Sequence, residues 1–215
     1  MKRKTFFAFL MALILFVPQV VADDDDYRSD YITVAVDGLT DFENIISNAS
    51  FDVEFTQSNV QRVEVYGDPN QVNNVNLTVV GKTLYVADKE KARVSQVKVL
   101  ITAPDLSCVI VNGTGDVDVK NLHTTRFTAT VTGAGSIELT GDSDEAEYTI
   151  SGRGDIDAEE FRVEMLTATV NDSGNIDCRC IDTLTATVVG SGSIEYHGHP
   201  RNIYRSGRKA AIRHD

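Results

Sequence analysis

The sequence predicts an all-β protein whose C-terminal half is a single-stranded parallel β-helix, wound right-handed, behind an irregular β N-terminal half. A composition with many Val, Ile and Thr, no Trp and only four Pro favours strands. A five-residue motif also recurs five times, with first residues 20, 19, 20 and 18 positions apart. Self-similarity at this period is typical of stacked repeats. The copies are Gly113–Val117, Gly133–Ile137, Gly152–Ile156, Asp172–Ile176 and Gly190–Ile194.

Residues 1–22 have the features of a secretory signal peptide. The basic Lys2-Arg3-Lys4 precedes the apolar run Phe6–Val17, and Val20–Ala22 offers a cleavage site. An uncleaved anchor is the alternative, although the run is short for a membrane span. We therefore expect an exported protein of the periplasm, the cell surface or the exterior, with no membrane span after cleavage.

Residues 23–30 form an acidic leader, and the mature chain is strongly acidic. Cleavage before Asp23 would remove three basic residues and lower the formal net charge from −12 to −15. This charge argues against nucleic acid and anionic membrane surfaces as partners.

Residues 31–105 predict irregular β coils that cap the repeats. Turn signals stand at Gly67–Asn70 and Val80–Lys82. Short runs of strand-forming residues flank them, and the expected strands are Phe51–Phe55, Val63–Val65, Leu77–Val79, Leu84–Val86 and Val97–Ile101.

Residues 106–199 predict regular coils of one strand, a glycine corner and a second strand. Apolar residues alternate with polar ones on both sides of each motif, as in Ala129 and Val131 before a corner and Ile137 and Leu139 after it. A third apolar stretch, including Met165 and Ile181, follows in most coils. The corner glycines suggest tight turns with positive φ. Strand–helix–strand units need longer repeats, and antiparallel hairpins would not return the same inward register.

Residues 200–215 are a basic cap or tail. We prefer a cap that blunts the last strand edge, and a docking tail is the alternative. The basic residues are Arg201, Arg205, Arg208, Lys209 and Arg213.

Three cysteines are present, and we expect mostly structural roles for them. Cys178 and Cys180 share a strand face, so a bond between them would need local distortion. The redox state of these two and of Cys108 is left open.

Acidic side chains on the outer face predict a candidate cation site. Parallel stacking would place one carboxylate after each corner in a row, about 4.8 Å from the next. Ca²⁺ takes such oxygen ligands, and the alternative is a solvated charged face. The row is Asp118, Glu138, Asp157, Asp177 and Glu195, flanked by Asp116 and Asp155.

A second outer column is rich in threonine and could bind a surface glycan or an envelope protein. The alternative is that Thr is simply a good strand residue. The column comprises Thr128, Thr130, Thr149, Thr167, Thr169, Thr185 and Thr187.

Other motifs favour structural interpretations. Arg153-Gly154-Asp155 spells an integrin-recognition tripeptide, but the repeat already demands its last two residues. His197 and His199 are too few to hold a metal alone. No catalytic constellation is evident, so we expect no enzyme. The alternatives are a carbohydrate-active, cation-dependent β-helix enzyme and a periplasmic structural or signalling partner.

The order of these features resembles the head GIN domain family of auto-transporter adhesins. The carrying segments are Asp41–Ile45, Phe51–Val53, Leu84–Val86, Ala103–Leu106 leading into the first motif, and Tyr196–Pro200. Asp172 departs from the pattern, because it replaces the first Gly of its motif. The resemblance implies a β-helical, secreted or cell-surface domain and supplies no catalytic residues.

Overall fold

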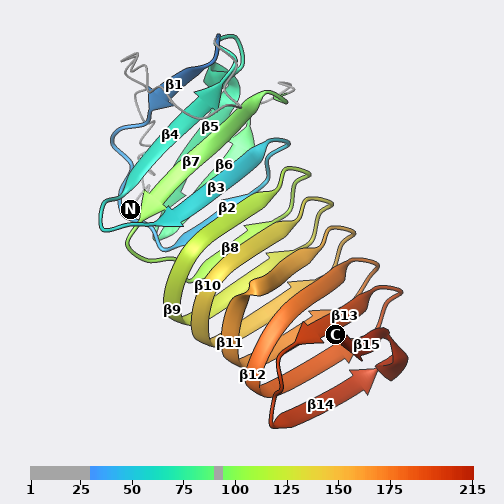
Figure 1. Ribbon diagram of the computed structural model, residues 1–215. Coiled ribbons are helices and arrows are strands. Elements are labelled where there is room, and N and C mark those ends of the chain that lie inside the picture. The colour runs from blue at the N-terminus through green and yellow to red at the C-terminus, as the bar shows by residue number, and fades with distance from the viewer. Residues whose placement is uncertain (1–29, 90–93) are drawn as a thin grey trace, which may run out of the picture.

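The computed structural model describes residues 30–89 and 94–215, and these residues form a β-solenoid with an antiparallel cap at its N-terminal end (Figure 1). The predicted signal peptide and residues 23–29 of the acidic leader lie outside the described residues. The helices of the described part are two 3₁₀ turns of three residues, η1 (Val72–Asn74) and η2 (Lys209–Ala211), and neither is long enough to cross a membrane.

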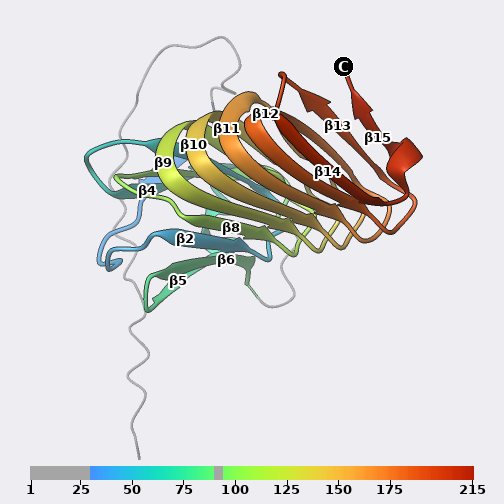
Figure 2. The ribbon, with the colours of Figure 1, turned by 90° about the horizontal axis from the view of Figure 1, so that it is seen from below.

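Four long strands wind round successive coils and confirm the predicted solenoid (Figure 2). Neighbours pair in parallel and in register, with irregularities part-way along each strand. The first part of each strand therefore lies on one face of the solenoid and the last part on another. The four strands are β9 (Val117–Val131), β10 (Ile137–Ile150), β11 (Ile156–Val170) and β12 (Asn175–Val188).

Shorter strands extend this stack in both directions. Before β9, β8 (Cys108–Val111) pairs in parallel with its last part. After β12, β13 (Ser193–His197) continues the first face and β15 (Ile212–His214) pairs with it, while β14 (Asn202–Gly207) continues the other face. The basic C-terminal segment thus contributes a further turn of the same solenoid.

The N-terminal half joins the stack through two of its strands. β2 (Asn44–Ser47) pairs in parallel with β8, and β3 (Asp52–Gln57) pairs in parallel with β9. Antiparallel pairing of β1 with β4, β4 with β7, and β5 with β6 then builds the cap. These strands are β1 (Ile32–Ala35), β4 (Arg62–Gly67), β5 (Val75–Val80), β6 (Thr83–Asp88) and β7 (Val97–Ala103).

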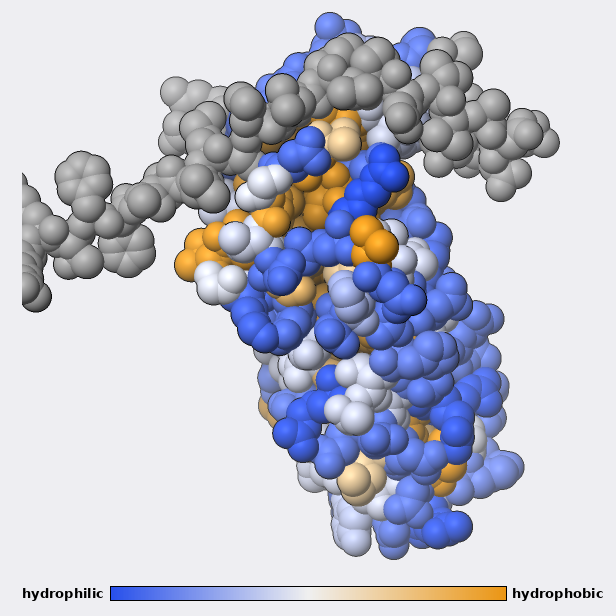
Figure 3. All heavy atoms as spheres, turned by 90° about the vertical axis from the view of Figure 1, so that its left-hand side faces the viewer, coloured by the Kyte–Doolittle hydropathy of each residue, from blue (hydrophilic) through white to orange (hydrophobic). Residues whose placement is uncertain are grey.

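One core of apolar side chains runs the length of the described chain, and the alternation predicted for it is confirmed. Ala129, Val131, Ile137 and similar inward residues are at most 2% exposed. On the side seen in Figure 3, the surface over the coils is mainly hydrophilic, and apolar colour is more extensive near the N-terminal end. The prediction that a third apolar stretch faces the core was partly wrong, because Met165 is 46% exposed and Ile181 is only half-buried.

The corner glycines serve close approach, and the expectation of positive φ was wrong. Among the described residues, the glycines with positive φ all lie outside the five motifs. Instead, a Cβ added to Gly154 would lie 1.9 Å from the carbonyl oxygen of Gly135 in the preceding corner. Gly135 stands in the same relation to Gly115, at 2.2 Å. Coils stack so tightly at this corner that only glycine leaves room for the backbone above it.

Candidate functional site

The predicted row of carboxylates is present on the outer side of the first face. Glu138 of β10 pairs in register with Asp118 of β9 and Asp157 of β11. Asp177 of β12 continues the row, flanked by Asp157 and by Glu195 of β13. Each of these five residues directly follows one copy of the five-residue motif, so the motif places them at the same point of successive coils.

The row has a sixth acidic member that sequence reasoning missed. Glu54 of β3 pairs in register with Asp118, so the row extends into the N-terminal half. The sequence does indicate this position, because Asp52-Val53-Glu54 repeats the acidic–apolar–acidic pattern of Asp116-Val117-Asp118. No glycine corner precedes this segment, so it does not match the five-residue motif.

Basic side chains neutralise the two ends of the row. Lys120 Nζ lies 2.9 Å from Glu54 Oε2, and Lys98 Nζ lies 3.8 Å from Asp118 Oδ2. At the other end, Arg213 Nη2 lies 3.7 Å from Glu195 Oε2. None of the ion pairs among the described residues includes Glu138 or Asp157 in the middle of the row.

Partial burial acts on two of these carboxyl groups. It raises the pKa of Asp118, while Lys98 and Lys120 act in the opposite direction. Burial likewise raises the pKa of Asp177, and the nearby His197 opposes it. The row is therefore not a freely solvated face at these two positions.

The flanking acids Asp116 and Asp155 are engaged with the backbone of the next coil. Asp116 Oδ1 accepts a hydrogen bond from the Ser136 backbone N–H at 2.7 Å, and Asp155 Oδ1 accepts one from the Asn175 N–H at 2.6 Å. These bonds cap the corners in a structural role. They also occupy Asp155 of the Arg-Gly-Asp tripeptide. Binding of Ca²⁺ by the full set of seven acids stays a prediction.

The threonine column forms a regular ladder on the second face. Thr167 of β11 pairs in register with Thr185 of β12, and Thr169 pairs with Thr187. In the row that contains Thr167 and Thr185, Glu147 of β10 lies between Thr128 and Thr167. None of the column's threonines is buried, as expected for outward positions.

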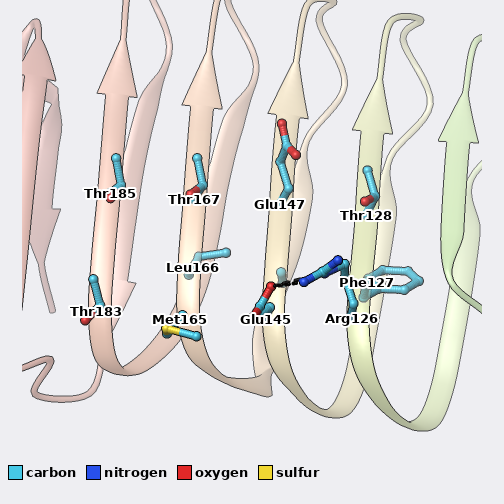
Figure 4. A pocket seen from close by; sticks show the side chains of 11 residues that line it. Arg126, Phe127, Thr128, Glu145, Glu147, Met165, Leu166, Thr167, Thr183 and Thr185 are labelled. Atoms are coloured by element: carbon cyan, nitrogen blue, oxygen red, sulfur yellow. Dashed lines mark hydrogen bonds and ion pairs between the residues drawn. The ribbon is translucent and has the colours of Figure 1, made fainter.

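An open groove of about 360 Å³ lies over one end of this ladder (Figure 4). One row of residues that line the groove consists of Thr128, Glu147, Thr167 and Thr185. A second row holds Arg126, Glu145, Met165 and Thr183, which are in register with one another.

The groove combines three kinds of contact. Arg126 donates from Nε and Nη2 to Glu145 Oε2, at 3.0 and 2.6 Å. The thioether of Met165 is exposed beside that ion pair, and the threonine hydroxyls follow in the neighbouring row (Figure 4). Hydroxyl donors and acceptors next to a charged pair and an apolar contact suit a polyhydroxylated ligand or a polar peptide.

The histidines do not act together as a pair. His197 Nε2 lies 2.8 Å from Asp177 Oδ1, whereas the exposed His199 packs its ring against His214. His197 also lies near Glu159 of β11, a residue that sequence reasoning did not single out.

The three cysteines are free thiols. Cys178 and Cys180 share the inner face, as predicted, and both are fully buried. Burial raises the pKa of all three thiols, which disfavours the reactive thiolate. This fits the structural role expected for them.

Comparison with known proteins gives a family match. A family model described as "Putative auto-transporter adhesin, head GIN domain" matches residues 41–200. A search of curated proteins gives no match.

Several solved structures share the fold. A protein of Bacteroides fragilis titled a putative adhesin has 24% identity and a TM-score of 0.65, over 87% of this chain and 98% of its own. A protein of Parabacteroides distasonis titled a putative lipid binding protein has 20% identity and a TM-score of 0.55, over 87% and 97%. A putative adhesin of Parabacteroides merdae has 20% identity and a TM-score of 0.50, over the same shares. With its glycine-cornered coils and the match over residues 41–200, the chain belongs to the head GIN domain family.

Proposed function

We propose that this protein is an exported, non-enzymatic adhesin of the cell envelope that binds a surface glycan through the groove on its threonine-rich face. The observation that carries the proposal is the groove itself. Threonine hydroxyls from successive coils repeat there at the strand spacing, about 4.8 Å, beside the Arg126–Glu145 ion pair. The family description supports a role in surface attachment.

The groove suits part of a polymer better than a small buried substrate. Its volume is near the lower end of ligand pockets, and it is open to solvent. Met165 offers an apolar contact to a sugar ring or a side chain. The pair of Thr167 and Thr185 can hydrogen-bond to neighbouring groups of a repeating ligand, because the coils hold the two residues in register.

Removal of two groove hydroxyls tests the proposal. The double variant Thr167→Val and Thr185→Val keeps β-branched side chains on both strands, so the fold should persist. Two lost hydrogen bonds of about 1 kcal/mol each predict affinity weaker by roughly tenfold or more. The measurement is binding of the mature protein to a glycan array, followed by titration of the best ligand.

The matched control is Thr149→Val with Thr169→Val. These two residues lie on the same face but do not line the groove, so binding should be unchanged. Equal loss in both double variants, or no ligand on any array, would remove the support for the groove. Release of shortened products from a bound polysaccharide would favour the enzymatic alternative instead.

A further inference from the structure

A cluster of three metal-ligating side chains lies on the first face, away from the threonine-rich groove. Glu159 of β11, Asp177 of β12 and His197 of β13 each offer one ligand atom, and these atoms all lie within 4.8 Å of one another. They come from three successive coils. Among the described residues, these three are the His, Cys, Asp or Glu side chains that lie close enough together to share one ion.

The imidazole of His197 is held between two carboxylates. Its side chain is only 14% exposed, its Nε2 lies 2.8 Å from Asp177 Oδ1, and its Nδ1 lies 3.5 Å from Asp215 Oδ2. A carboxylate behind one ring nitrogen orients the other nitrogen toward a metal in many protein sites. Asp215 stands behind Nδ1 here, and Nε2 faces Asp177 of the cluster.

We propose that Glu159, Asp177 and His197 bind a divalent transition-metal ion of the Zn²⁺ class, with Asp215 as the carboxylate that orients the histidine. One nitrogen and two carboxylate oxygens form a ligand set that such ions accept. Ca²⁺ takes oxygen ligands and would leave the imidazole unused. The site therefore differs in chemistry from the calcium row expected from sequence, although Asp177 belongs to both.

The distances between the ligand atoms need little change to fit a tetrahedral Zn²⁺ site. Ligands about 2.0–2.2 Å from Zn²⁺ stand about 3.3 Å apart in a tetrahedral shell. The 2.8 Å between His197 Nε2 and Asp177 Oδ1 is already close to that value. Glu159 has a half-exposed side chain, so rotation about its own bonds can bring its carboxylate the remaining distance. The fourth position would face solvent and hold water.

The surrounding charge favours a cation in spite of one arginine. Asp157 and Glu195 flank Asp177 in the acidic row. Arg179 Nη2 lies 3.9 Å from Glu159 Oε1, a loose ion pair, and its Nε donates to the backbone carbonyl of Glu159 at 2.8 Å. The backbone bond anchors the guanidinium beside the site, and the carboxylate oxygens of Glu159 remain able to bind an ion.

The test is calorimetric titration of the untagged mature protein with ZnCl₂ after dialysis against a chelator. The proposal expects one saturable equivalent of Zn²⁺ and a higher melting temperature on binding, because an ion that binds only the folded state stabilises it. Glu159→Gln and His197→Asn should each weaken the affinity at least tenfold. Thermal melts of both variants without metal show whether each one is folded. Glu159→Gln, at an exposed position, keeps the test valid if His197→Asn does not fold.

The matched control is His199→Asn, because His199 is exposed and lies outside the cluster. It should bind Zn²⁺ with the affinity of the unchanged protein. Absence of saturable binding, or equal affinity in Glu159→Gln and the unchanged protein, would overturn the proposal. A His199→Asn variant weakened as much as His197→Asn would also overturn it. Glycan binding is not involved in any of these outcomes.

Discussion

At the scale of single residues, Tyr148 is the most unusual member of the core. Its side chain is fully buried, and its hydroxyl has no hydrogen-bond partner among the described residues. Burial raises its pKa well above the ordinary value, and the neighbouring thiols Cys178 and Cys180 add to the effect. A buried hydroxyl without a partner costs about 1–3 kcal/mol of stability.

Replacement of Tyr148 by Phe should therefore stabilise the protein by about 1 kcal/mol at pH 7. The difference in unfolding free energy between the variant and the unchanged protein should widen above pH 10. There, tyrosine ionises in the unfolded chain but stays protonated in the fold, so the unchanged protein loses stability as the pH rises. Thermal melts of both proteins at pH 7 and pH 10.5 measure this. A Phe variant that is less stable at pH 7, or a difference that stays constant, would contradict it.

Sequence alternation predicted the inward position of Tyr148 but not the outward position of Met165. Alternation is reliable within a straight strand, and Tyr148 lies in the regular stretch before a corner. In β11, Val163 and Leu166 are both buried although they lie three residues apart, so the period of two breaks between them and Met165 faces outward. The sequence pattern does not show where this break in alternation falls.

At the scale of the repeating element, the glycine corner determines the register of the stack. Each corner backbone lies directly against the one before it, and a side chain at Gly154 would occupy the space of the Gly135 carbonyl. The polar residue after the corner then caps the next coil, as Asp155 does for Asn175. Close approach and capping together hold successive corners in register.

Gly154→Ala should destabilise the protein by roughly 1–3 kcal/mol, because two coils must separate to admit the methyl group. Arg153→Ala is the matched control in the same corner, since Arg153 is exposed and its backbone already carries a Cβ. Chemical denaturation of both variants measures the difference. Equal stability of the two would show that the corners are not tightly stacked.

The sequence predicted the acidic row but not the proposed metal cluster. The repeated motif places Asp157 beside Asp177, because each residue directly follows the last residue of its motif. Glu159 lies where the register shifts between Ala158 and Arg162, so the repeat alignment does not reveal its neighbour. Glu54 was missed for a related reason, since its coil enters the stack without a glycine motif.

At the scale of the whole molecule, the solenoid separates two surfaces of different chemistry. Carboxylates stand in a row on one face, and threonine hydroxyls form a ladder on the other. Both surfaces depend on one property, the parallel register of successive coils. A shift by one residue between two coils would turn every outward side chain inward and abolish both proposed sites.

A single engineered cysteine tests this register most directly. Cys108 of β8 pairs in register with Thr128 of β9, while Thr130 pairs with Ile110. Parallel neighbours stand about 4.8 Å apart, within the range of about 4.4–6.8 Å between the Cα atoms of a disulfide. Thr128→Cys should therefore form an intramolecular disulfide with Cys108 on prolonged oxidation, measured by thiol alkylation in denaturant and mass spectrometry. Thr130→Cys should not, and cross-linking of Thr130→Cys in place of Thr128→Cys would contradict the stacked register.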